Sequence, residues 1–234
     1  MHVLILGATG RNGALVLAEA LERGHTVTAL VRDPSAAALA PHPNLTLVKG
    51  SPLSLPDLRA AMRTPPGDGP DAVVVALNAR RVSDSPFAAL HPDTPAALVH
   101  DSVRNALEAM RDDDGTLLRA RKLVVNSMQG AGASNPSLVL PLRVLFNHSN
   151  MRHTLDDHNA VDALVRGDRG DGVDWVLVRP PMLTEGESLP VKVYGDDGSG
   201  VSWMPKITRR SVAGFMVDAI EKDEWNRGAP VITN

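Results

Sequence analysis

The chain has 234 residues, of which 43% are hydrophobic and 22% charged, a balance typical of a globular protein with a full apolar core. The formal net charge of −3, with no block of like charges, argues against a nucleic-acid or anionic-membrane surface. The absence of cysteine excludes disulfides and thiol chemistry.

The first thirteen residues carry the most informative pattern. A short apolar run at residues 2–6 ends in three glycines, Gly7, Gly10 and Gly13, and a helical pattern follows at once. A strand then leads into a tight turn, and the turn opens a helix whose free N–H groups and dipole favour a phosphate. Gly7 allows the turn, Gly10 lets the backbone approach a pyrophosphate, and Gly13 lets helix and strand pack closely. The pattern predicts a dinucleotide site, and a βα turn without a ligand is the alternative.

Strand and helix signals alternate along the rest of the chain. Short runs rich in β-branched residues predict strands at 26–31, 45–48, 72–77, 122–126 and 175–178. Apolar residues spaced by three and four predict helices, with one face each from Ala14, Leu17, Ala18 and Leu21; Leu55, Leu58 and Met62; Val103, Ala106, Leu107 and Met110; and Val212, Phe215, Met216 and Ala219. Gly24 marks a helix stop, and the composition of residues 64–70 predicts a surface loop.

Repeated βα units with buried strands predict an α/β fold with a doubly wound parallel sheet, of the Rossmann type. We expect a single domain, 1–234, with substrate-side segments at about 128–155 and 181–210. A strand that starts at residue 2 leaves no signal peptide, and no apolar run reaches membrane-spanning length, so a cytoplasmic protein is expected.

The end of the second strand bears on the choice of cofactor. An NAD site usually has an acidic residue there, but this strand ends in Arg32, whose guanidinium suits the 2′-phosphate of NADP. Arg11 adds charge from the helix start, while Asp33 is a competing ribose ligand. We therefore expect NADP rather than NAD; a solvated loop arginine is the alternative for Arg32. The remaining residues of the glycine turn, Thr9 and Asn12, are expected to contact the same cofactor.

The chain resembles the atypical short-chain dehydrogenases, and within them the NAD(P)-binding group of NmrA-like proteins and biliverdin reductase B, the flavin reductase. The resemblance rests on the glycine motif, on Val-Arg-Asp-Pro at 31–34 and on Asp-Asp-His at 156–158, which the pattern places at the opening of a helix. It also rests on Val-Arg-Pro-Pro at 178–181 and on the closing helix from Ile207. It implies an NAD(P)-dependent oxidoreductase, with Pro180 beside the cofactor.

The chain departs from that family at several positions. The Tyr-x-x-x-Lys pair of short-chain dehydrogenases is absent, since the one tyrosine is Tyr194 and position 198 is Gly198. The acidic residue that commonly follows the third strand is replaced by Ser51, which weakens any adenine contact there. The last helix has Ser211 where Asp is common.

Two polar residues follow buried strands and are expected near the nicotinamide. Ser127 follows the strand at 122–126, at the edge where parallel sheets bind ligands, and can orient a substrate carbonyl or bond the nicotinamide amide. The related enzymes keep a serine at this strand end. Asn78 ends the preceding strand and is expected to line the cofactor. For both, a turn-forming role is the alternative.

The histidines His148, His153 and His158 recur at intervals of five, which on one helix would point their rings to different faces. We therefore expect no metal site. His158 is a candidate proton donor, and its alternative is a local pair with Asp162 four residues on. His153 is a candidate at the mouth of the site.

Apolar residues dominate the segments after the fifth and sixth strands, with the pocket walls expected to include Met128, Leu138, Leu140, Leu142, Phe146, Met182, Leu183, Trp203 and Met204. We expect an NADPH-dependent reductase of a hydrophobic or aromatic small molecule, monomeric or homodimeric, without a tyrosine proton relay. Two alternatives stay open: a non-redox isomerase, dehydratase or cyclase that retains NADP structurally, and an NmrA-like NADP-sensing regulator.

Overall fold

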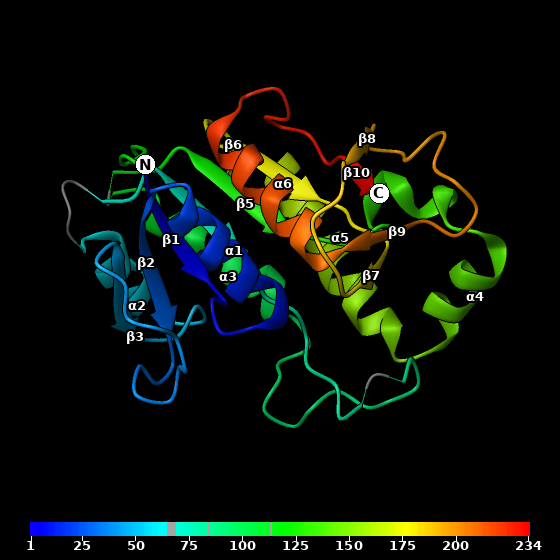
Figure 1. Ribbon diagram of the computed structural model, residues 1–234, viewed down its shortest axis with the longest axis horizontal. Helices are drawn as coiled ribbons and strands as arrows, with labels where there is room; N and C mark the ends of the chain where they lie inside the picture. Colours follow the sequence, from blue (N-terminus) through cyan, green and yellow to red (C-terminus); the bar gives the residue numbers. More distant parts are fainter. Residues whose placement is uncertain (65–68, 84, 113) are drawn as a thin grey trace.

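The computed structural model describes residues 1–64, 69–83, 85–112 and 114–234. At its centre is a six-stranded sheet in the order β3-β2-β1-β4-β5-β6, with all neighbouring strands parallel (Figure 1). The strands are β1 (His2–Leu6), β2 (Thr26–Val31), β3 (Leu45–Lys49), β4 (Ala72–Val75), β5 (Lys122–Asn126) and β6 (Asp174–Val178). This confirms the predicted doubly wound Rossmann fold. Of the loop predicted at 64–70, residues 65–68 lie outside the described residues.

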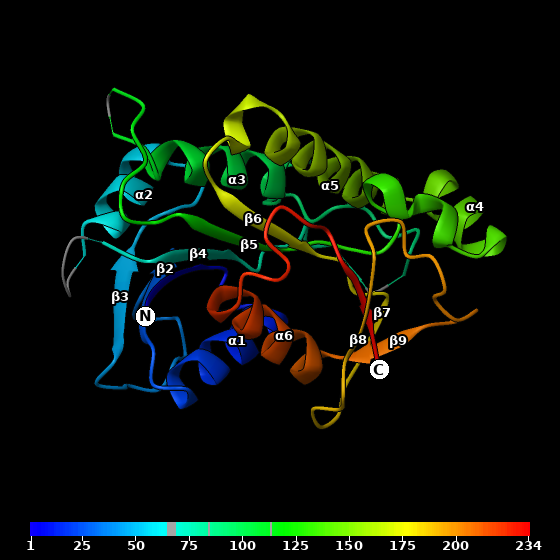
Figure 2. The ribbon, with the colours of Figure 1, turned by 90° about the horizontal axis from the view of Figure 1, so that it is seen from above.

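Helices cover both faces of the sheet (Figure 2). The pair α1 (Arg11–Glu22) and α6 (Arg209–Glu221) packs on one face, and α2 (Leu55–Met62), α3 (Leu98–Ala109) and α5 (Met151–Arg166) pack on the other. Alternate residues of each strand enter the two cores, so Val3 and Ile5 face α1 and α6, whereas Leu4 and Leu6 face the opposite layer. Every residue of β1, β4 and β5 is therefore buried, as their apolar runs predict.

The apolar face predicted for α1 is confirmed at Leu17 and Leu21, which pack in the core, and is wrong at Ala18. The buried residues of this helix are Asn12, Gly13, Val16, Leu17 and Ala20, whereas Ala18 is exposed. Gly13 lies against the backbone of the glycine turn, and residues three, four and seven positions later share its face. The close approach at Gly13 thus sets the rotation of the helix.

The predicted strand at 72–77 is two residues too long. Ala76 still donates its N–H to Leu6 O at 2.9 Å, but the neighbouring strand β1 ends at Leu6 and offers no further partner. The chain therefore leaves the sheet at this point, beside the glycine turn.

Small elements gather beyond the carboxyl ends of β5 and β6. Strand β7 (Met182–Thr184) pairs with β9 (Lys206–Thr208), and β8 (Lys192–Tyr194) pairs with β10 (Val231–Thr233). Helix α4 (Leu140–His148) and two short 3₁₀ turns, Gly132–Ser137 and Asp168–Gly170, complete the elements. Among the described residues, no helix is long and apolar enough to cross a membrane.

Candidate functional site

The three glycines of the turn after β1 are required for different reasons. Gly7 has a φ of +92°, and a Cβ there would lie 2.7 Å from Ala76 O. A Cβ on Gly13 would collide with Gly7 O. Gly10, by contrast, has an extended φ of −80°, and the nearest atom to a Cβ would be 3.3 Å away. The fold itself thus requires Gly7 and Gly13, whereas a Cβ on Gly10 would make a tight contact with Gly7 O that a smaller local shift could relieve.

The N-terminus of α1 opens at this turn. Among the described residues, no side chain caps the helix, and its first turn contains no acidic residue. Because the first N–H groups of a helix have no partner inside it, they and the helix dipole are available to an anion. The turn itself is closed by a hydrogen bond from Gly10 N to Gly7 O at 2.9 Å. The backbone therefore forms a ready cradle for a phosphate group.

The side chain of Asn12 is directed toward α6. Its Oδ1 accepts a hydrogen bond from Arg209 Nη1 at 2.6 Å, and Arg209 Nε donates to Glu185 Oε1 at 2.8 Å. The glycine turn is thus tied to the start of α6 and to the segment after β7. A cofactor contact from Asn12 remains a prediction for its backbone N–H.

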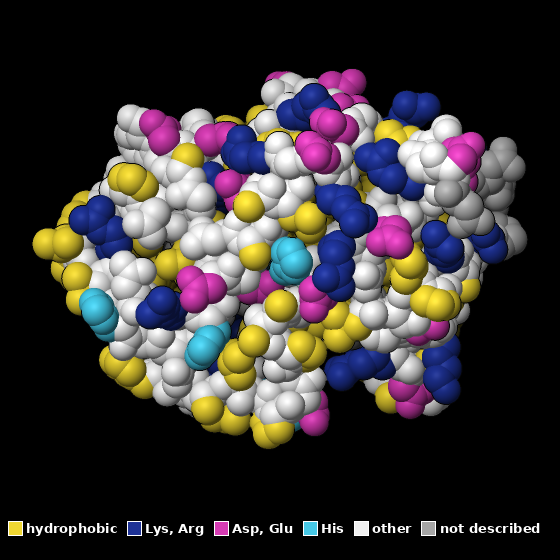
Figure 3. Space-filling view, turned by 180° about the vertical axis from the view of Figure 1, so that it is seen from behind, with side chains coloured by type: hydrophobic (Ala, Val, Ile, Leu, Met, Phe, Trp, Pro, Cys, Tyr) yellow, Lys and Arg dark blue, Asp and Glu magenta, His cyan; other side chains and the backbone are white. Residues whose placement is uncertain are grey.

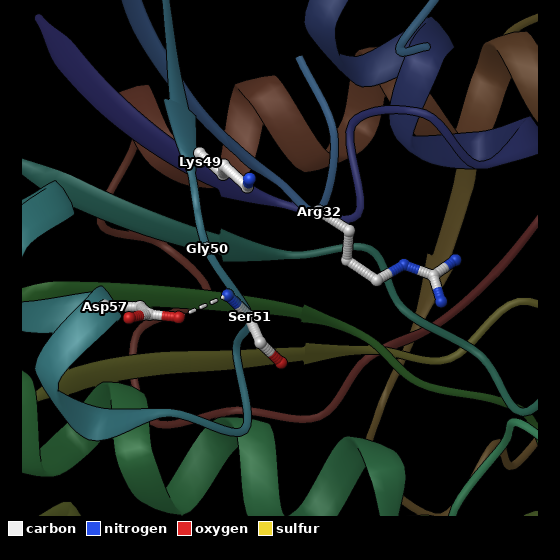
Figure 4. A pocket seen from close by; sticks show the side chains of 5 residues that line it. All are labelled: Arg32, Lys49, Gly50, Ser51 and Asp57. Atoms are coloured by element: carbon white, nitrogen blue, oxygen red, sulfur yellow. Dashed lines mark hydrogen bonds between the residues drawn. The ribbon is translucent and has the colours of Figure 1, made fainter. Parts of the chain in front are cut away.

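A hollow of about 380 Å³ lies at the carboxyl ends of β2 and β3, lined by Arg32, Lys49, Gly50, Ser51 and Asp57 (Figure 4). A second hollow of about 350 Å³ adjoins Thr9, Val31, Arg32, Asp33, Ala36 and Ala37. Arg32 lines both, so its exposed guanidinium lies between the glycine turn and the end of β3. Lys49 and Asp57 were not expected at this site, because neither follows a strand in a known motif.

Asp33, the competing ribose ligand, is held by its own turn. Its Oδ1 accepts hydrogen bonds from Ser35 N at 2.9 Å and Ser35 Oγ at 2.6 Å. These bonds lower the pKa of Asp33 below its ordinary value, so the carboxylate is charged at neutral pH. One carboxylate oxygen is therefore engaged locally, and the end of β2 carries two opposite charges, those of Arg32 and Asp33.

Ser127 follows β5 directly, as predicted, and its N–H donates to Val178 O at 2.7 Å. By strand alternation it shares the face of Leu123 and Val125, toward α5. Its Oγ is buried and has no hydrogen-bond partner among the described residues. A buried hydroxyl is expected to find a partner in a ligand group or an ordered water.

Asn78 and Pro180 lie at the same edge of the sheet. Asn78 is exposed, two residues past the last contact of β4 with β1. Pro180 is buried, and its carbonyl accepts a hydrogen bond from Gln129 N at 2.9 Å. The strand ends that carry Asn78, Ser127 and Pro180 are thus adjacent, but their contacts with a cofactor remain predictions.

The Asp-Asp-His segment does not open a helix, because α5 begins at Met151 and residues 156–158 lie in its second turn. Asp157 caps a different helix: its carboxylate accepts hydrogen bonds from Val99 N at 2.9 Å and His100 N at 2.8 Å, in the first turn of α3. Burial raises the pKa of Asp157, against the effect of these two bonds. The predicted helix opening at residues 156–158 is therefore wrong, and Asp157 caps α3 from within α5.

The expected pair of His158 with Asp162 is also wrong. Asp162 Oδ1 instead accepts from Arg179 Nη2 at 2.6 Å and from Arg166 Nε at 3.1 Å. His158 is buried, its Nδ1 has no partner among the described residues, and burial together with the charge of Arg179 lowers its pKa to about 4. The ring is therefore neutral at neutral pH, which does not favour a proton-donor role.

His148, His153 and His158 do not share a helix. His148 ends α4, whereas the other two lie in α5, and His153 is exposed. Within the described part of the chain, no group of three or more His, Asp or Glu side chains is arranged to hold a metal ion.

Several of the residues that were expected to form the apolar walls of a substrate pocket are exposed to solvent. Trp203 is 74% exposed and Leu140 63% exposed, and Met182 and Met204 are also exposed, whereas Leu138 is buried. The loop before α3 adds Phe87, 64% exposed, whose carbonyl accepts a hydrogen bond from Asn150 Nδ2. Hydrophobic side chains gather along the left and lower edges of Figure 3, which correspond to α4 and this loop.

Comparison with known proteins gives a consistent result. Residues 7–223 match a family described as NAD(P)H-binding. Reductase pytE of Aspergillus terreus is 27% identical over 206 residues, which cover 79% of this chain and 76% of that protein.

Solved structures share the fold over the whole chain. A protein from Lactobacillus casei has a TM-score of 0.71 and 23% identity, covering 100% of this chain and 99% of that one. The anaerobillin reductase ChuY from Escherichia coli O157:H7 has a TM-score of 0.71 and 16% identity, covering 100% and 97%. At these identities the likeness concerns the fold.

Proposed function

The chain belongs to the NAD(P)H-binding family, and on that premise we propose that it is an NADPH-dependent reductase of a hydrophobic or aromatic organic small molecule. The observation that carries the proposal is the glycine turn after β1, where backbone geometry, an uncapped helix and a neighbouring arginine meet. The reductase named above among its relatives supports redox chemistry rather than a purely structural use of the cofactor.

The glycine turn fits a dinucleotide. We expect a side chain at Gly10 to reach the space where a pyrophosphate would lie against the N-terminus of α1. The fold tolerates a Cβ there better than at Gly7 or Gly13. We propose that close approach of a ligand to the backbone, together with the tight contact between a Cβ and Gly7 O, accounts for the glycine at position 10.

The charges at the ends of β2 and β3 favour NADP over NAD. Arg32 and Lys49 line the same hollow and supply two cations for a 2′-phosphate. Asp33, which would serve a 2′-hydroxyl, has one carboxylate oxygen engaged by Ser35 and the other open to a ligand. The described residues offer no ion pair or hydrogen bond to Arg32, so its guanidinium is available to a ligand.

When bound, NADPH supplies a hydride to an electrophilic carbon of the substrate. Ser127, at the end of a central strand, is the residue that we assign to orient the nicotinamide or the substrate, because its buried Oγ lacks a protein partner. Tyr194 lies in β8 and is followed at position 198 by a glycine, so it has no lysine partner for a proton relay. Reduction of the substrate requires a proton in addition to the hydride, and we propose that solvent supplies it.

The exposed apolar side chains of α4, of the loop before α3 and of the segment after β6 support an apolar substrate. They belong to segments that follow the carboxyl ends of β4, β5 and β6, the edge of the sheet at which Ser127 lies. A substrate with a large planar or aliphatic surface would bury them, whereas a sugar phosphate would not.

The proposal is tested by mixing the protein with NADPH and a panel of flavins, quinones and α,β-unsaturated ketones and following the loss of NADPH absorbance. We expect oxidation of NADPH with at least one acceptor and none with the folded variant Gly10→Val, whose side chain blocks the pyrophosphate. Tight binding of NADPH with no oxidation, together with conversion of a metabolite, would contradict the reductase and favour the non-redox alternative.

A further inference from the structure

The hollow at the ends of β2 and β3 contains charges of both signs. Arg32 and Lys49 approach it from the two strand ends, and Asp57 approaches it from the first turn of α2 (Figure 4). A phosphate alone would be repelled by a carboxylate in the same hollow. The lining therefore suits a ligand that presents an anion at one end and a hydrogen-bond donor at another.

Asp57 is held in place by two features of the chain. Its Oδ2 accepts a hydrogen bond from Ser51 N at 2.8 Å. Gly50 lies over its side chain, since a Cβ on Gly50 would be 2.7 Å from Asp57 Cβ and 2.9 Å from Leu30 Cδ1. The missing side chain at position 50 thus lets the carboxylate pack close beneath the end of β3.

The carboxylate retains acceptor capacity that the protein does not use. Among the described residues, Ser51 N is the one hydrogen-bond donor to this carboxylate. A carboxylate has about four lone-pair sites, so most of its acceptor capacity is unused. Ser51, which occupies the position after Gly50, brings only a hydroxyl to the hollow. A carboxylate fixed on one oxygen and open on the other is a specific acceptor for an N–H donor.

We propose that Asp57 accepts a hydrogen bond from the exocyclic amine of the adenine ring, while Arg32 and Lys49 hold the phosphate on the same adenosine. This inference rests on the proposed function, because it assigns the base-recognition residue of the proposed NADP site. An adenosine 2′-phosphate carries its phosphate and its amino group on opposite parts of the molecule, and so it matches the two signs of charge.

The test compares NADP with nicotinamide hypoxanthine dinucleotide phosphate, in which a carbonyl oxygen replaces the exocyclic amine. A calorimetric titration of each with the wild-type protein should give NADP an affinity about 10- to 100-fold higher, as expected for a hydrogen bond to a charged acceptor. The hypoxanthine carbonyl would face the carboxylate with no proton between them.

In the variant Asp57→Asn, the measured quantity is the ratio of the affinities for the two dinucleotides. Loss of a purely structural role of Asp57 would leave this ratio unchanged. Its Oδ1 can keep the bond from Ser51 N, which turns the amide nitrogen toward the base as a donor. The two affinities should then become about equal, or the hypoxanthine compound should bind more tightly than NADP. The control Lys49→Met should weaken both ligands by the same factor and leave their ratio unchanged, because both carry the 2′-phosphate.

Equal affinity of the wild-type protein for the two dinucleotides, or an unchanged ratio in a folded Asp57→Asn variant, would overturn the inference and leave the proposed function standing. Failure of the wild-type protein to bind either dinucleotide would instead overturn the proposed function, and the assignment of Asp57 with it.

Discussion

At the scale of single residues, the buried polar atoms near the ends of β5 and β6 are of two kinds. Some have hydrogen-bond partners within the protein, and others have none among the described residues. Arg179 is fully buried and bonds to Asp162 and to the carbonyl of Asp196, so it joins β6 to α5 and to the segment after β8. Ser127 Oγ, on the neighbouring strand end, has no such partner. The first arrangement is structural, and the second is the one expected of a ligand contact.

Ser127→Ala should slow turnover by up to about 10²- to 10⁴-fold, because the hydroxyl positions the reacting groups or passes a proton. Tyr194→Phe should leave most turnover intact, since position 198, where a Tyr-x-x-x-Lys pair would have its lysine, is a glycine. Single-turnover rates at saturating NADPH measure both variants. A nearly inactive Tyr194→Phe beside an unimpaired Ser127→Ala would reverse the assignment.

His158 should make stability depend on pH. Burial and the nearby Arg179 lower its pKa in the folded state to about 4, below its ordinary value of 6.5. Between these values the unfolded chain binds a proton that the folded protein does not, so stability falls as the pH is lowered through this range. From pH 7 to pH 5 this group alone should remove about 2 kcal/mol from the free energy of unfolding.

Denaturant unfolding of the wild type and of His158→Asn at both pH values measures this effect. The variant should lack the contribution of His158, so that the difference in unfolding free energy between the two proteins changes by about 2 kcal/mol between pH 7 and pH 5. A difference independent of pH would show that the ring titrates normally in the folded protein.

At the scale of elements, α3 depends on a residue far away in the sequence. Its N-cap residue, Ala97, offers no side-chain acceptor, and the first-turn N–H groups of Val99 and His100 bond instead to Asp157 of α5. An acidic group at a helix N-terminus is favoured by the helix dipole and by the free N–H groups. Asp157 therefore fastens α3 to α5 on one face of the sheet.

Asp157→Ala should lower the free energy of unfolding by about 2 kcal/mol, because two buried N–H groups lose their acceptor. The neighbouring Asp156 is the matched control: its side chain is 60% exposed and pairs with Arg152 at 3.4 Å. Asp156→Ala should change stability by less than about 0.5 kcal/mol. Equal losses in the two variants, measured by denaturant unfolding, would contradict the capping role.

The sequence could predict the main elements, because their apolar patterns are local. The strands 26–31 and 122–126 and the buried faces of α3 and α6 follow from hydrophobic runs and spacing within a dozen residues. The start of α5, the partner of Asp162 and the cap on α3 depend on residues that meet only when the sheet and helices assemble. Spacing within one helix suggested the wrong partner for His158, since Arg179 is brought in by another strand.

At the scale of the whole molecule, the topology brings the candidate site together from distant segments. The order β3-β2-β1-β4-β5-β6 places the glycine turn after β1 at the centre of the sheet, with Arg32 and Lys49 on one side and Ser127 on the other. This is the arrangement in which doubly wound sheets bind dinucleotides, at the carboxyl edge where the direction of winding reverses. The glycine motif and Arg32 were visible in the sequence, whereas Lys49 and Asp57 required the folded strand ends.

The measurement that tests the account most directly is calorimetric titration of the wild type and Arg32→Ala with NADP and with NAD. The wild type should bind NADP more tightly, and Arg32→Ala should lose about 1.5–3 kcal/mol of binding free energy for NADP while its affinity for NAD stays unchanged. The exposed Arg63, which follows α2, is the control, and Arg63→Ala should leave both affinities as they are. Equal binding of NADP and NAD by the wild type, or an unchanged ratio in Arg32→Ala, would contradict the account.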